Sequence, residues 1–174
     1  MASSTLLLQP PVTARVATVL VRATVLASLV LSLAVMTTDT TTLQVGINLS
    51  VEVKFMDVYS YRYMLGTIVI GAAYTLLQIA NTIYGICTAN QSAGSDGVLL
   101  FDFFGDKMVS YFLATGAAAA FGATKDLKAA TEGSGSNVDK FFDNGYAAAS
   151  LLLFSFICCA LLSVISSFSL PKNI

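Results

Sequence analysis

Four apolar segments alternate with polar stretches along the chain, and each is long enough to cross a bilayer. A helix needs about 20 predominantly apolar residues to span the hydrocarbon core of a membrane. The pattern therefore predicts helices at about residues 15–36, 63–86, 100–123 and 145–168. The expected fold class is all-α: an integral membrane, antiparallel four-helix bundle in which the first and third helices run in the same direction.

Only short segments of the chain lie before the first predicted span and after the last. A short segment, residues 1–14, precedes them, and another, residues 169–174, follows them. Pro10 and Pro11 discourage a helix that starts earlier from continuing into the first segment. We therefore expect a single membrane domain at 15–168 and no second domain.

The connections between the segments differ in character. Residues 87–98 and 124–144 are rich in polar residues, and in Ser and Gly in particular, which predicts flexible loops. Residues 50–57 alternate between polar and apolar side chains, so they fit either a short strand or an ordered loop.

The composition agrees with a membrane protein. Hydrophobic residues make up 56% of the chain and charged residues only 11%, whereas a soluble domain carries about 25% charged residues. The formal net charge of -1 includes no basic patch of the kind that binds nucleic acid by releasing counterions. Lipid is therefore an expected partner, and nucleic acid is not.

Catalytic chemistry finds little support. The chain contains no His, so a catalytic Ser or Cys would lack its usual base and a metal its commonest ligand. Cys87, Cys158 and Cys159 form no Cys-x-x-Cys pair. We expect no enzyme activity, no cofactor, no metal site and no small-molecule substrate.

Two ionisable residues inside predicted spans are the strongest clue to a site. Arg22 and Asp106 each lie about two turns in from the N-terminal end of their segments. Because the first and third helices run in the same direction, this equal distance places both residues at the same depth. A charge at the centre of a span costs about 2.5 to 3.5 kcal/mol, so the two residues are expected to neutralise each other.

The pair has two interpretations. A structural ion pair would hold the first and third helices together, whereas a proton or ion relay would require a continuous path of titratable groups. The fourth segment supplies no such group, which favours the structural pair. Lys107 lies about 100° around the helix from Asp106; it could pair with Asp102 or extend toward the membrane surface.

Polar side chains on the second and third segments predict further contacts between helices. Because lipid offers no hydrogen-bond partner, Gln78 and Asn81 are expected to bond across helices. Asp102 lies one turn before Asp106 on the same face of the third segment. The second segment carries a single stripe of polar and small residues: Thr67, Gly71, Tyr74, Gln78, Asn81 and Gly85.

Two questions stay open from the sequence: whether the first segment is retained as a span or cleaved, and which way the protein faces across the membrane. Arg15, Arg22 and the Ser32-Leu33-Ala34 sequence also fit a cleaved secretory signal, but the partner at Asp106 favours a retained span. Asn48 begins an Asn-x-Ser sequon and is a candidate N-glycosylation site. The positive-inside rule places more Lys and Arg on the cytoplasmic side. Cytoplasmic termini would contradict this rule, because the outer loops would then hold more basic residues than the inner segments. The outer residues would be Lys54, Arg62, Lys125, Lys128 and Lys140, and the inner ones Arg15 and Lys172.

The chain resembles a known plant family in a specific set of residues. These are Arg22, Tyr74, and the segment Phe101–Leu113 with the Ala-rich sequence that follows it. On these residues the chain is similar to the Casparian strip membrane domain proteins and their Casparian-strip-like (CASP-like) relatives. The family's characteristic span-one Arg and span-three Asp correspond to Arg22 and Asp106.

The resemblance implies a plasma-membrane protein with both termini cytoplasmic, related in architecture to the MARVEL group of four-span proteins. It also implies homo- and hetero-oligomers with related four-span proteins, and a scaffold role without catalysis, in which membrane platforms position cell-wall-modifying machinery. Strip-building members carry an aromatic-rich sequence in the first outer loop, and residues 37–59 contain no such cluster. A general membrane-organising role is therefore expected rather than strip formation.

Two other functions compete with the scaffold. A small transporter or channel subunit would use the intramembrane pair Arg22 and Asp106. A claudin-like or tetraspanin-like adhesion protein is disfavoured, because the predicted outer loops lack Cys and the chain lacks Trp.

Overall fold

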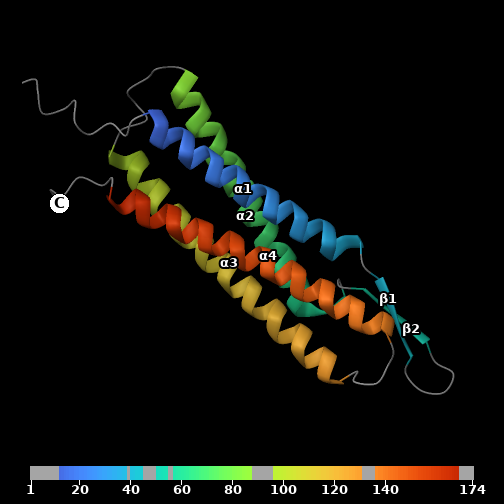
Figure 1. Ribbon diagram of the computed structural model, residues 1–174. Coiled ribbons are helices and arrows are strands. Elements are labelled where there is room, and N and C mark those ends of the chain that lie inside the picture. Colours follow the sequence, from blue (N-terminus) through green and yellow to red (C-terminus); the bar gives the residue numbers. More distant parts are fainter. Residues whose placement is uncertain are drawn as a thin grey trace, which may run out of the picture.

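The computed structural model describes residues 12–38, 40–44, 50–54, 57–87, 96–130 and 136–168. Four long helices make up most of it (Figure 1). The predicted four-helix membrane bundle is therefore confirmed. The helices are α1 (Val12–Thr38), α2 (Tyr59–Cys87), α3 (Asp96–Ala130) and α4 (Ser136–Phe168).

The helices run alternately up and down, and each packs mainly against two neighbours. α1 packs on α2 and α4, and α3 packs on the same two helices, so α1 and α3 face each other across the diagonal of the bundle. α1 begins, α2 ends, α3 begins and α4 ends at one end of the bundle (Figure 1). The first and third helices therefore run in the same direction, as the sequence predicted.

A small β-hairpin lies at the opposite end of the bundle. β1 (Thr40–Gln44) pairs antiparallel with β2 (Ser50–Lys54), with Thr40 opposite Lys54 and Gln44 opposite Ser50. Of the two alternatives for this segment, the strand is therefore correct for residues 50–54. β1 lies against α4 and extends the bundle beyond the end of α1 (Figure 1).

The helices are longer than the apolar segments that predicted them, and the largest difference is between α3 and α4. The flexible loop predicted at 124–144 is wrong for most of its length, since α3 continues to Ala130 and α4 begins at Ser136. Phe141 and Phe142 are buried there, and the Nζ atom of Lys128 lies 3.5 Å from Asp143 Oδ1. These contacts continue the bundle into a region that its polarity alone assigned to a loop.

Within the described residues, three helices contain segments that are long and apolar enough to cross a membrane: Val16–Thr38, Tyr59–Gly85 and Asp139–Ser167. α3 carries Asp102, Asp106 and Lys107, which lower its overall hydropathy. It nevertheless runs the length of the bundle, packed between α2 and α4 (Figure 1). Because its most buried charge is neutralised inside the protein, α3 can cross the same layer as its neighbours.

Small residues allow the helices to approach closely. Ala117 and Ala120 of α3, and Ala148 and Ala149 of α4, are almost completely buried. Gly116 of α3 lies directly against the side chain of Thr67 on α2. In a membrane, where lipid is as apolar as a protein core, such close backbone approach supplies much of the packing energy.

Candidate functional site: a buried polar network

The centre of the network is a two-pronged ion pair across the diagonal of the bundle. The Nη1 atom of Arg22 donates to Oδ1 of Asp106 at 3.1 Å, and Nη2 donates to Oδ2 at 2.9 Å. Arg22 is 4% exposed and Asp106 is 1% exposed. The two parallel bonds fix both the distance and the orientation of α1 relative to α3.

α2 adds a chain of hydrogen bonds to this pair. The hydroxyl of Tyr74 donates to Oδ1 of Asp106 at 2.8 Å. The amide nitrogen of Gln78 lies 2.9 Å from the Tyr74 hydroxyl and 2.8 Å from Oδ1 of Asp102, and it donates to both. Side chains of two helices, α1 and α2, therefore converge on the two carboxylates of α3, and each carboxylate accepts at least one bond from another helix.

Most polar atoms of the network are satisfied inside the protein. In the described part of the chain, Arg22 Nε is the buried side-chain nitrogen that has no hydrogen-bond partner. A buried donor in this state costs about 1 to 3 kcal/mol. The two terminal nitrogens of Arg22 therefore stabilise the bundle, whereas its unpaired Nε destabilises it.

Asn81, which was predicted to bond across helices, lies outside the network. Its side chain is exposed on α2. Viewed along the helix axis, the half-buried Thr82 lies about 40° from Gln78 in one direction. Asn81 lies about 60° from Gln78 in the opposite direction. The stripe drawn from the sequence therefore turns away from α3 at Asn81. Asn48, the candidate glycosylation site, falls outside the described residues.

A second set of polar contacts, between α1 and α4, was not predicted from the sequence. The hydroxyls of Ser28 and Ser155 lie 2.6 Å apart, and Ser32 donates to the carbonyl oxygen of Ala148 at 2.9 Å. Ser28 and Ser32 lie four residues apart and therefore on one face of α1. This spacing was the signal that could have predicted the contact.

The comparisons with known proteins agree with the resemblance. Residues 12–158 match the family model of the Casparian strip membrane protein domain. The chain belongs to this family. The match includes Arg22, Tyr74, Gln78, Asp102 and Asp106, so the whole network lies within the Casparian strip membrane protein domain.

CASP-like proteins of several plants are similar over nearly the whole chain. CASP-like protein 4D1 of Ricinus communis is 52% identical over 165 residues, which cover 95% of this chain and 97% of that protein. CASP-like protein 4D1 of Populus trichocarpa is 54% identical over 162 residues, covering 92% and 89%. CASP-like protein 4D2 of Arabidopsis thaliana is 44% identical over 169 residues, covering 94% and 95%. No solved structure matches the chain.

The chemistry of the site is that of a closed contact between helices. Within the described residues, no group of three or more His, Cys, Asp or Glu side chains is placed to hold a metal ion. The carboxylate of Asp106 is occupied by three donor contacts, two from Arg22 and one from Tyr74. The arrangement can therefore tie α1, α2 and α3 together in a CASP-like bundle.

The substitution Tyr74→Phe tests the contribution of α2. It removes the donor to Asp106 and the acceptor for Gln78, so the free energy of unfolding should fall by about 1 to 3 kcal/mol. Tyr63→Phe is the matched control, because Tyr63 lies on the same helix and its hydroxyl bonds to Thr115 at an exposed position. Thermal unfolding in detergent should show a larger loss for Tyr74→Phe; an equal loss would contradict the role of the network.

Proposed function

We propose that this protein is an oligomeric plasma-membrane scaffold, with both termini in the cytoplasm, that organises a membrane domain and positions cell-wall-modifying machinery. Membership of the Casparian strip membrane protein domain family supports the proposal. The family is one of membrane proteins, and its name links it to a specialised region of plant membrane. A scaffold requires a stable shape and an outer surface for association rather than a catalytic centre.

The observation that carries the proposal is the closed interior of the bundle. Asp106, Asp102, Gln78 and Tyr74 form hydrogen bonds with one another or with Arg22. These bonds hold three helices at fixed positions, whereas a translocation path would need polar groups that face an open channel. A rigid bundle of this kind suits repeated lateral packing in a membrane.

The orientation follows the family rather than the count of basic residues. α1 begins and α4 ends at the same end of the bundle (Figure 1), which supports a topology with both termini on one side of the membrane. We assign this side to the cytoplasm. Protease protection of tags placed at each terminus tests the assignment.

Single-particle tracking tests the scaffold directly. A fluorescently tagged protein at native expression in plant cells should diffuse slowly, in clusters that contain several copies. An unrelated four-span plasma-membrane protein with the same tag is the control. Free diffusion as single copies, at the rate of the control, would overturn the proposal.

The alternative is a small transporter or channel subunit. It is favoured by one observation, the presence of Arg22, Asp102 and Asp106 close together inside the bundle. Ion or proton flux into liposomes that contain the purified protein, abolished by Asp106→Asn, would establish it. Liposomes with the unmodified protein that are no leakier than empty ones would exclude it.

A further inference from the structure

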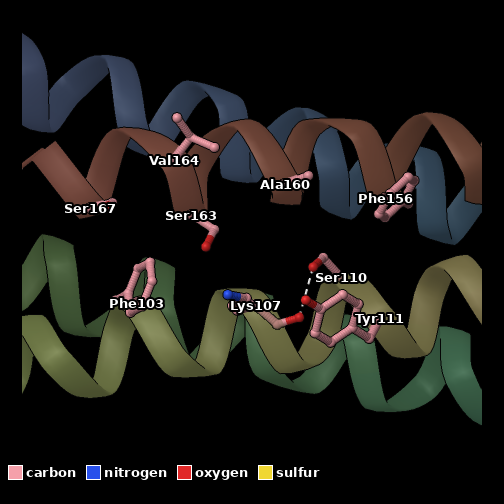
Figure 2. Close-up of a pocket in the computed structure, with 9 residues that line it drawn as sticks. All are labelled: Phe103, Lys107, Ser110, Tyr111, Phe156, Ala160, Ser163, Val164 and Ser167. Carbon is pink, nitrogen blue, oxygen red and sulfur yellow. Dashed lines mark hydrogen bonds between the residues drawn. The ribbon is translucent and has the colours of Figure 1, made fainter.

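A groove between α3 and α4 lies apart from the buried network. It has a volume of about 430 Å³ and opens on the outer surface of the bundle. Its walls combine a cation, Lys107, with the hydroxyls of Ser163 and Ser167 and the rings of Phe103, Tyr111 and Phe156 (Figure 2). It therefore presents a positive charge, hydrogen-bond donors and apolar surface together on the membrane-facing side.

Lys107 has no carboxylate partner in the described part of the chain. The adjacent Asp106 turns inward to Arg22, and Asp102 accepts from Gln78. The Nζ atom of Lys107 instead lies 5.7 Å from the centre of the Phe103 ring, and its side chain is exposed. An exposed ammonium group inside a membrane is costly unless it reaches water or an anion.

Ser163 faces the same groove with an unused hydroxyl. The residue is only 7% exposed and forms no hydrogen bond within the described residues. Figure 2 shows its oxygen directed from α4 toward Lys107 on α3. The groove thus holds two donors without acceptors, one charged and one neutral, that point into the same space.

Lys107 lies in the first third of α3, so this space is nearer the end of the bundle at which α3 begins. Lys107 lies eleven residues after Asp96, about 16 Å along the helix axis from its first residue. Phe103, one turn earlier, lies toward the nearer end of the bundle, and the ammonium group extends over it. A lysine that bends toward the end of its helix in this way carries its ammonium group toward the lipid phosphates.

We infer that this groove binds the headgroup phosphate of an anionic phospholipid. The ammonium of Lys107 and the hydroxyl of Ser163 donate to phosphate oxygens, and the hydroxyl of Ser167 lies closer to the surface. The rings of Phe103, Tyr111 and Phe156 contact the acyl chains. No bond is made or broken; the lipid supplies the acceptors that the two donors lack.

In the proposed orientation, with both termini in the cytoplasm, the groove opens to the cytoplasmic leaflet, where anionic lipids are concentrated. The lipid would then occupy the outer surface on which copies of the scaffold associate. Lipid binding by the purified protein does not depend on that association, so the two proposals can fail separately.

Native mass spectrometry of the purified protein with defined lipids tests the site. Phosphatidic acid should be retained more strongly than phosphatidylcholine with the same acyl chains. Lys107→Gln should weaken this retention about fivefold, the effect expected from one basic residue near a lipid surface. Ser163→Ala should weaken it less, and Lys107→Arg should preserve it.

Two controls show whether the loss of retention is specific to this groove. Lys125→Gln removes an exposed lysine from the other end of α3 and should leave the retention unchanged. The thermal unfolding midpoint of each variant confirms that it is folded. Equal retention by Lys107→Gln and the unmodified protein would overturn the inference.

Two further outcomes would also overturn it. Glycerol 3-phosphate that competes as well as the lipid would show a general anion site rather than a lipid site. A dimer that dissociates on Lys107→Gln, without any preference for anionic lipid, would show that an acidic group of a second copy occupies the groove. If the protein prefers phosphatidic acid but diffuses freely in cells, the scaffold proposal fails and the lipid site stands.

Discussion

Asp106→Ala is expected to lower the free energy of unfolding by about 3 to 5 kcal/mol, because it leaves the Arg22 guanidinium buried without its carboxylate. Arg22→Ala should have a similar effect for the opposite charge. Steric trapping in bicelles measures the loss, and the yield of folded protein should fall in parallel. Asp126→Ala is the matched control, since Asp126 is an exposed carboxylate on the same helix.

The reversed pair separates a specific contact from a general intolerance of substitution. Arg22→Asp combined with Asp106→Arg should recover part of the lost stability, because the charges again face each other at the same depth. Full recovery is not expected, since Tyr74 would then donate toward a guanidinium that accepts nothing. If the single variants are as stable as the unmodified protein, and the double variant shows no coupling energy between the two positions, the stabilising role of the ion pair is refuted.

Gly116→Ala is expected to destabilise the packing of α2 on α3 by about 1 to 3 kcal/mol, although alanine favours a helix over glycine by about 1 kcal/mol. A Cβ atom at this position would collide with the hydroxyl of Thr67 and would lie 3.1 Å from its Cβ and 3.2 Å from its Cγ2. Rotation of the threonine relieves the first contact but leaves its Cβ in place. The two helices must therefore move apart.

Gly122→Ala is the control on the same helix, because a Cβ there would meet nothing within 4 Å. It should be neutral or slightly stabilising in the same thermal unfolding assay. Equal behaviour of the two alanine variants would show that the close approach at Gly116 contributes nothing to the bundle.

Much of this architecture could be predicted from the lengths and order of the apolar segments. The four spans follow from the length of the apolar segments, and the equal depth of Arg22 and Asp106 follows from helix direction. The sequence left a strand and a loop as alternatives for residues 50–57, because alternating polarity is compatible with both, and it did not predict β1. Casparian strip family membership was predicted from a small set of intramembrane residues and agrees with the match over residues 12–158.

The differences between prediction and structure have three physical causes. The helical extension that contains Phe141 and Phe142 was assigned to a loop, because local polarity is visible in a sequence while burial against distant residues is not. Asn81 was included in the polar stripe that was expected to face protein, but its side chain is exposed, because a deviation of about 60° decides which neighbour a helical side chain meets. The contacts of Ser28 and Ser32 with α4 depend on which helices become neighbours, and four spans alone do not specify that.

The diagonal ion pair also constrains how the chain is made. Arg22 and Asp106 are separated by 84 residues, so the ribosome completes the first helix long before the third. At about 5 to 20 residues per second, the arginine waits about 4 to 17 s for its counter-charge. During this interval the nascent first helix bears the cost of an unneutralised guanidinium. Insertion should therefore be cooperative across the first three helices, with the leading helix retained at the translocon until the third arrives.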